Sequence, residues 1–350
     1  MCKKNGRWLV LIATIVIILS NSIVVSAAGT KNGWSRDSDG DVIYYRNGKK
    51  LIGWQRLQGC HSGISQYKDT WHWFYFNEDG EMAATELKEI DDEYYYFDAC
   101  GFMQTGWQKI RNVRYYFADS GAMETETWIE DKEANDWYYV DADGAMVTGW
   151  EIINNKWYYF YESGIMADGW KTINEKRYYF DDGAMADKWK NIAGTWYYFV
   201  DGAMVNGWKE IDGKWYYFDN GAMVTGVKTI DDHQYGFAED GHMATGWLKV
   251  NTNEAYGGTA WYYFNPDGIM RTGWLQIGSN WFFLKPSGKM ATGWLKIVNG
   301  KPVTYESDPE KYHDAPIYYF DEDGYMATGT REIRGKIYYF ADDGHCTNFN

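Results

Sequence analysis

The stretch GWKEIDGKWYYFDNGAMVTG, residues 207–226, decides the fold because it is one copy of a unit that recurs along the chain. The preceding segment, KWKNIAGTWYYFVDGAMVNG, carries the same pattern. All twelve methionines beyond Met1 fall in a Gly-x-Met position of this unit, and Cys346 takes that position in the last copy. Such agreement identifies a repeat protein.

Each unit is marked by a Gly-Trp pair or by a degenerate equivalent of it. Most marks are 19 to 22 residues apart, and the three longer intervals contain insertions at 59–72, 251–260 and 299–316. The marks are Trp34, Trp54, Glu86, Trp107, Trp128, Trp150, Trp170, Trp189, Trp208, Val227, Trp247, Trp274, Trp294 and Thr330.

One unit predicts one β-hairpin. The strand-like runs WKEI and WYYF flank Asp212-Gly213, a dipeptide that favours a two-residue hairpin turn. This turn sets a register in which Trp208 lies opposite Tyr217 and Trp215 shares their face, while the alternate residues of WYYF point to the other face. The Gly before each Met is expected in a turn conformation that other residues resist.

A single two-stranded hairpin is marginally stable in water, so each unit must bury its aromatic residues against its neighbours. The sequence therefore predicts an all-β repeat solenoid of stacked hairpins. Aromatic residues make up 19% of the chain, with 20 Trp and 31 Tyr. Two Trp of one hairpin and a Tyr of the next can enclose a gap walled by ring faces, which suits a quaternary ammonium ion.

Residues 1–27 have the pattern of a secretory signal peptide, with Lys3, Lys4 and Arg7 before an apolar run and small residues at the end. A membrane anchor is the alternative, but polar residues interrupt the apolar run. Cleavage would change the net charge of −15 to −18 and leave residues 28–350 as a secreted repeat region without a membrane span. Acidity argues against nucleic acid as a partner. The three remaining cysteines, Cys60, Cys100 and Cys346, do not make a disulfide framework.

The units at 207–226 and elsewhere resemble the choline-binding, or cell-wall-binding, repeats of Gram-positive surface proteins, over nearly all of residues 32–350. The resemblance implies a left-handed solenoid in which choline lies between consecutive repeats. It also implies association with the cell wall through choline-decorated teichoic or lipoteichoic acid, or through another wall polysaccharide. Related repeats bind glucan or host glycan, so a lectin or adhesin is the alternative function.

The resemblance assigns each choline to two Trp of one repeat and one ring of the next. Seven such sets are complete: Trp54, Trp73 and Tyr95; Trp128, Trp137 and Tyr158; Trp150, Trp157 and Tyr178; Trp189, Trp196 and Tyr216; Trp208, Trp215 and Tyr235; Trp247, Trp261 and Phe282; and Trp274, Trp281 and Tyr318. Arg114, Arg177 and Ile317 replace the second Trp in three other units, where binding should be absent or poor.

Catalytic chemistry is not expected. The six His are scattered, without the spacing of a zinc site or an HExxH motif. The stretch DSDGD (37–41) lacks the glycine and glutamate of a calcium-binding loop at the required positions, so a solvated turn is the better interpretation. The sequence therefore predicts a binding protein without catalytic residues, metal or cofactor.

Overall fold

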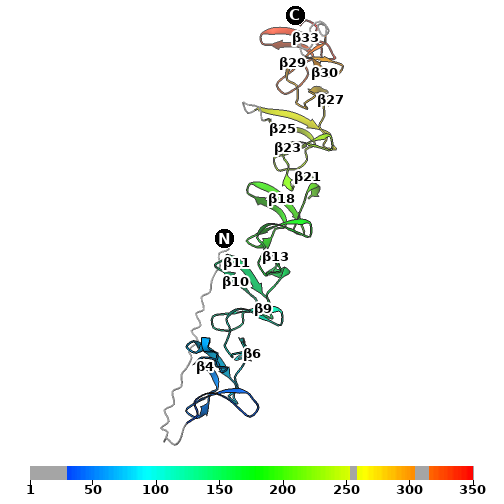
Figure 1. Cartoon of the computed structure of the whole chain (residues 1–350). Helices are drawn as coiled ribbons and strands as arrows, with labels where there is room; N and C mark the ends of the chain where they lie inside the picture. The colour runs from blue at the N-terminus through cyan, green and yellow to red at the C-terminus, as the bar shows by residue number, and fades with distance from the viewer. Residues whose placement is uncertain (1–29, 253–257, 304–314, 350) are drawn as a thin grey trace. The chain divides into compact units, whose positions relative to one another are not determined.

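The computed structural model describes residues 30–252, 258–303 and 315–349, which form fourteen antiparallel sheets of two or three strands (Figure 1). These residues contain one short 3₁₀ turn, η1 (Ser65–Tyr67), and no α-helix. The predicted all-β fold of successive hairpins is confirmed. The signal peptide prediction and parts of the insertions at 251–260 and 299–316 lie outside the described residues.

The described chain forms two compact units. The first runs to Ile173 and also includes Tyr179–Met185; the second consists of Asn174–Tyr178 and the residues from Ala186 onward.

The strands of the first unit are β1 (Gly33–Arg36), β2 (Val42–Arg46), β3 (Lys49–Lys50), β4 (Gly53–Gln58), β5 (Trp71–Phe76), β6 (Glu86–Ile90), β7 (Glu93–Phe97), β8 (Gly106–Ile110), β9 (Val113–Phe117), β10 (Thr127–Asp131), β11 (Asp136–Val140), β12 (Gly149–Ile153), β13 (Lys156–Phe160), β14 (Gly169–Ile173) and β16 (Ala184–Met185). Strand β15 (Lys176–Asp181) contains residues of both units.

The strands of the second unit are β17 (Lys188–Ile192), β18 (Thr195–Val200), β19 (Ala203–Met204), β20 (Gly207–Ile211), β21 (Lys214–Asp219), β22 (Ala222–Met223), β23 (Gly226–Ile230), β24 (His233–Phe237), β25 (Gly246–Thr252), β26 (Gly258–Phe264), β27 (Gly273–Ile277), β28 (Asn280–Leu284), β29 (Gly293–Val298), β30 (Lys301–Val303), β31 (Ile317–Phe320), β32 (Gly329–Ile333) and β33 (Lys336–Phe340).

The hairpin β20–β21 has the predicted register. Trp208 pairs with Tyr217, and Glu210 pairs with Trp215. The turn residues Asp212 and Gly213 have φ values of 50° and 74°. Positive φ at both central positions is the requirement of a type I′ turn, whose twist matches that of the strands it joins.

Neighbouring hairpins are joined by backbone hydrogen bonds from the Gly-x-Met segments. The Met166 N–H donates to the Trp137 carbonyl of the preceding repeat (2.8 Å), and the Met243 N–H donates in the same way to Trp215 (2.7 Å). The last Phe of the WYYF run belongs to the core; Phe160 and Phe218, for example, are fully buried. Each repeat therefore needs its neighbour, as the stacking argument predicts.

The glycine of the Gly-x-Met segment is required for two reasons. Gly121 has a φ of 87°, which confirms the predicted turn conformation. A Cβ at this position would also lie 2.2 Å from Sδ of Met103 in the preceding repeat. The glycine thus leaves room for the methionine of the repeat before it.

Within the described residues, no helix has the length and apolar character needed to cross a membrane.

Candidate functional site

The two Trp of one hairpin lie on the same face with their rings nearly perpendicular. In β20–β21 the ring centroids of Trp208 and Trp215 are 6.3 Å apart, with an angle of 79° between the ring planes. Trp208 also contacts Tyr217, its partner across the strands, at 5.2 Å. The register places both indoles on one face, because alternate residues of a strand share a face.

A third ring comes from the next repeat. Tyr235, in β24, lies 4.9 Å from Trp208 at an angle of 74°. Phe237 lies 5.7 Å from the same indole and is almost completely buried. Trp208 thus has two roles, since it packs on the core of the next repeat and forms one wall of the space between repeats.

Five of the seven predicted sets have all three rings arranged in this way. The Trp–Trp centroid distances lie between 6.1 and 6.5 Å, and the third ring lies 4.9 to 5.1 Å from the first Trp. The five sets are Trp128, Trp137 and Tyr158; Trp189, Trp196 and Tyr216; Trp208, Trp215 and Tyr235; Trp247, Trp261 and Phe282; and Trp274, Trp281 and Tyr318.

The first and third predicted sets are described in part. Trp54 lies 4.7 Å from Tyr95, and Trp73 takes the second-Trp place in the strand register, opposite Arg56. Trp150 lies 6.2 Å from Trp157, whereas the third residue of that set, Tyr178, belongs to the other compact unit.

The second Trp is exposed in five of the seven sets. Trp196 and Trp215 each keep 45% of their surface accessible to solvent. Trp157, Trp261 and Trp281 are exposed in the same way. Indoles exposed at the same position of several repeats form a regularly spaced series of apolar surface patches, which is typical of an interaction surface.

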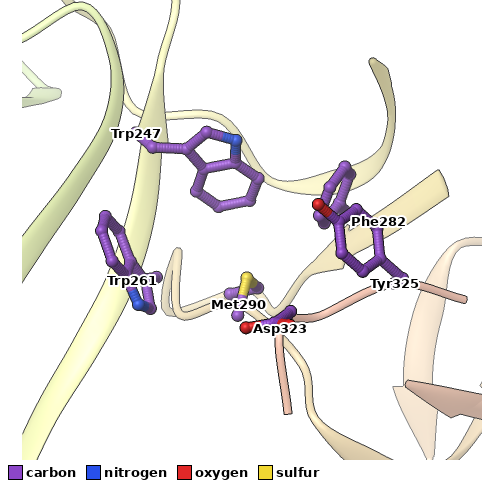
Figure 2. A pocket seen from close by; sticks show the side chains of 6 residues that line it. All are labelled: Trp247, Trp261, Phe282, Met290, Asp323 and Tyr325. Atoms are coloured by element: carbon purple, nitrogen blue, oxygen red, sulfur yellow. The ribbon is translucent and has the colours of Figure 1, made fainter. Parts of the chain in front are cut away.

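The set around Trp247 encloses a cavity of about 380 Å³. Figure 2 shows Trp247 and Trp261 on one side, the Phe282 and Tyr325 rings on the other, and Met290 and Asp323 along the remaining edge. Asp323 and Tyr325 belong to the repeat after that of Phe282, and the Phe282 and Tyr325 rings are 5.2 Å apart. This cavity is therefore lined by three consecutive repeats.

Negative charge surrounds several of these rings. Burial and the carboxylate of Asp240 raise the pKa of Tyr216, and burial and Asp343 raise the pKa of Tyr318. At the Trp247 set the protein itself supplies a cation: Nζ of Lys249 lies 5.8 Å from the centroid of the Trp261 ring. Neutral phenols, ring faces and nearby carboxylates together favour a cation over an anion.

The family of choline-binding repeats matches residues 84–128, 104–148, 129–168, 147–188, 186–225, 257–293 and 316–347, which together cover more than half of the chain. The chain belongs to the choline-binding repeat family. A cell wall binding repeat also matches at residues 72–82.

Two relatives outline the range of proteins that carry such repeats. The crystal structure of choline binding protein F from Streptococcus pneumoniae is 28% identical in sequence and superposes with a TM-score of 0.50. The aligned region includes 69% of this chain and 93% of choline binding protein F. Glucosyltransferase-S of Streptococcus downei is 31% identical over 134 residues, which are 36% of this chain. The chain spans only 9% of the length of that enzyme, so the likeness concerns a small part of it.

Two of the three units with a replaced second Trp keep the first Trp and the third ring in contact. Trp107 lies 5.2 Å from Tyr138, with Arg114 opposite Lys109 in the second-Trp position. Burial is the main cause of the raised pKa of Tyr138, and the nearby Arg114 charge acts in the opposite direction. The guanidinium is therefore close enough to act on the third wall of this junction.

The other such repeat gains a ring that the sequence did not indicate. Ile317 holds the second-Trp position, and Trp294 lies 4.7 Å from Tyr338. Phe349 lies 4.7 Å from Trp294 and 6.1 Å from Tyr338, so a third ring is present after all. Trp170, the third mark followed by a replaced Trp, lies 5.1 Å from Tyr179.

Sequence reasoning missed Asp323 and Tyr325 because it considered only pairs of repeats. The sequence feature that could have indicated Tyr325 is its position between Gly324 and Met326, where this repeat has a bulky residue. In another repeat this position forms a β-bridge to the third-ring residue of the repeat before it, as Ile269 does to Tyr235. An aromatic residue at this position therefore adds a wall to the preceding site.

The DSDGD turn is closed by its own side chain. Oδ1 of Asp37 accepts the backbone N–H groups of Asp39 (3.2 Å) and Asp41 (2.9 Å). In the described residues Asp37, Asp41 and Glu81 form a group of carboxylates close enough to share a metal ion. Exposed acidic groups of this kind are common without a metal, so the group carries no metal assignment.

Proposed function

We propose that this chain is a secreted, non-catalytic protein that binds the cell wall by recognising choline on teichoic or lipoteichoic acid. Each choline occupies the space between two Trp of one repeat and the Tyr or Phe of the next. Family membership supports the class of ligand, and the geometry of the five complete sets supports the mode of binding.

One observation carries the proposal: the fold does not need a Trp at the second position. The backbone bond that joins repeats is made from Met146 to Arg114 and from Met166 to Trp137 with the same length, 2.8 Å. The same bond is accepted by Val42, Gln234 and Ile317 at this position in other repeats. An exposed indole that stacking does not require is best explained by a ligand.

The chemistry of the space fits a quaternary ammonium ion. Such an ion has no hydrogen-bond donor to satisfy and spreads its charge over methyl groups that can contact several ring faces. Each well-placed ring contributes about 0.5 to 2 kcal/mol, so three rings give a dissociation constant in the millimolar range, where 1 mM corresponds to about −4.1 kcal/mol.

Weak single sites become a stable attachment when the ligand is a polymer. After one choline is bound, later contacts are intramolecular and raise the apparent affinity by about 10² or more. A wall polymer that displays many cholines should therefore bind this chain far more tightly than free choline does.

A glycan is the second candidate ligand, and the similarity to glucosyltransferases favours it. Aromatic faces also stack on sugar rings. Three rings around a compact gap suit a small cation better than a flat sugar, which would need one open face.

Thermal unfolding of the full chain separates these ligands. Choline should raise the melting temperature, because only the stacked repeats hold the site. The neutral isostere 3,3-dimethylbutan-1-ol and dextran should have little effect. An equal effect of choline and its neutral isostere would remove the cation from the proposal, and a larger effect of dextran would favour the glycan.

A further inference from the structure

The insertion at 59–72 packs on the turn of the following repeat. The His72 ring stacks on Phe102 with centroids 3.6 Å apart and an angle of 10° between the planes. Tyr67, at the end of η1, meets the same Phe102 ring edge-on at 5.1 Å. A segment that interrupts the repeat pattern thus has a fixed position against β6–β7 and its turn.

Two thiols meet in this contact. Cys60, from the insertion, is 5% exposed and belongs to the same buried cluster as Phe102, and Cys100, from the turn, packs against that cluster. The Cys60 thiol lies close enough to help burial raise the pKa of the Cys100 thiol. His61 lies at the same contact: burial lowers the pKa of its imidazole, and the backbone of Cys100 acts in the opposite direction.

Both cysteines depart from the repeat at the point where they meet. The position before the turn glycine holds Asp or Ser in neighbouring repeats, as at Asp79, Ser120 and Asp143, but holds Cys100 here. Cys60 lies in the insertion and has no counterpart in other units. Cys346 differs, because it takes the methionine position of its own repeat.

We propose that Cys60 and Cys100 form a disulfide bond that ties the insertion to the following repeat. This inference does not depend on choline binding. The bond would join residues 40 positions apart in sequence, and such a cross-link stabilises a fold mainly by restricting the unfolded chain. Outside the cell, where the signal peptide prediction places the chain, disulfides form and persist.

The oxidant is an external disulfide, such as oxidised glutathione. The half-buried Cys100 is reached before the buried Cys60. Its thiolate attacks the external disulfide, which forms a mixed disulfide and releases one thiol. The Cys60 thiolate then attacks Sγ of Cys100, forms the internal bond and releases the second thiol. Two protein thiols are oxidised, one external disulfide is reduced, and the two protons leave with the released thiols.

The environment of the pair makes this oxidation slow at neutral pH. Burial raises the pKa of the Cys100 thiol to about 11, and the adjacent Cys60 thiol contributes to the rise. Only the thiolate attacks. At pH values below the pKa, the thiolate fraction increases about tenfold for each unit by which the pH rises. The rate of bond formation should therefore rise by about that factor between pH 7 and pH 8.

Peptide mapping of the full chain after treatment with oxidised glutathione tests the proposal. Free thiols are alkylated, and trypsin then releases peptides 57–68 and 89–109, which the bond would hold together until a reductant is added. We expect this linked pair in the unmodified protein and in the matched control Cys346→Ser. Cys60→Ser and Cys100→Ser should each abolish it.

A second measurement does not rely on the variants folding. The oxidised full chain should show a melting temperature higher than that of its reduced form by several degrees, about 5 °C. The proposal would be overturned if Cys60 and Cys100 were both found alkylated after complete oxidation. A disulfide from either of them to Cys346 would overturn it as well.

Discussion

Two adjacent junctions of the first unit differ at one decisive side chain. Trp107 and Trp128 each begin a hairpin, contact the opposite Tyr of their own hairpin at 5.2 and 5.1 Å, and contact the third ring of the next repeat at 5.2 and 5.0 Å. The second-strand position holds Arg114 in the first junction and Trp137 in the second.

The comparison separates the part of the repeat that makes the fold from the part available for a ligand. The first Trp, the third ring and the Met hydrogen bond are present in both junctions, so they are sufficient for stacking. Arg114 and Trp137 change what the junction offers to a cation: one presents a positive charge, the other a ring face. We infer that the first junction is structural and that the second also binds.

The largest effect is expected when Trp137 is replaced by arginine, the residue at the equivalent position of the Trp107 junction. Trp137→Arg removes a ring and adds a positive charge within a few ångströms of the bound cation. Like charges at 4 to 6 Å near a protein surface repel strongly enough to lower affinity on the order of 100-fold, even after screening by salt. Equilibrium dialysis with labelled choline should show one site fewer per chain.

Trp137→Phe is the matched control, since it keeps a ring and adds no charge. Its stoichiometry should equal that of the unmodified protein. Retention of all sites by Trp137→Arg would mean that Trp137 takes no part in binding.

The reverse change should create a site. Arg114→Trp completes the set with Trp107 and Tyr138, which already lie at the spacing of the other sets. We expect one additional choline per chain, with a dissociation constant near 1 mM, because the new site has the same three rings as its neighbour. Arg111→Trp, which replaces an exposed arginine of the hairpin turn, is the control and should add none. Choline at the Trp107 junction of the unmodified protein would contradict the inference.

Much of this comparison could be made from the sequence. The Asp212-Gly213 turn fixed which residues share a face, and the methionine spacing fixed the boundaries of the units, since both depend on local geometry. The parts that were missed depend on contacts across more than one junction. Tyr325 reaches the site of Phe282 from the next repeat, and Phe349 reaches Trp294 from beyond the last hairpin.

The packing of the insertion at 59–72 was missed for a related reason. Sequence indicated where 59–72 interrupts the pattern, but the position of Cys60 beside Cys100 depends on how the segment packs on Phe102. No local pattern contains that information.

A smaller effect is expected from removing the ring alone. Trp137→Ala should weaken choline binding at its junction about tenfold, within the range for loss of one cation–π contact. Stability should change little, because this position keeps its backbone bond when Arg, Ile or Val is present. Trp128→Ala should instead lower the free energy of unfolding by about 2 to 3 kcal/mol, since that indole packs on the next repeat. Calorimetry of both variants distinguishes these outcomes, and equal destabilisation would show that Trp137 belongs to the core.

The smallest effect concerns the cavity lined by three repeats. Asp323 borders the Trp247 cavity from a solvent-exposed turn and can act as a counter-ion to a bound choline. Charge pairs at exposed positions contribute little, so Asp323→Asn should lower affinity at this site by about two- to fivefold and make it less dependent on salt. Glu322→Gln removes the same charge from the neighbouring position, which does not line the cavity, and should leave the affinity unchanged. Choline occupancy at the Trp247 site in a series of crystal soaks measures the difference. An equal decrease in both variants would assign the effect to the general negative charge of the protein rather than to Asp323.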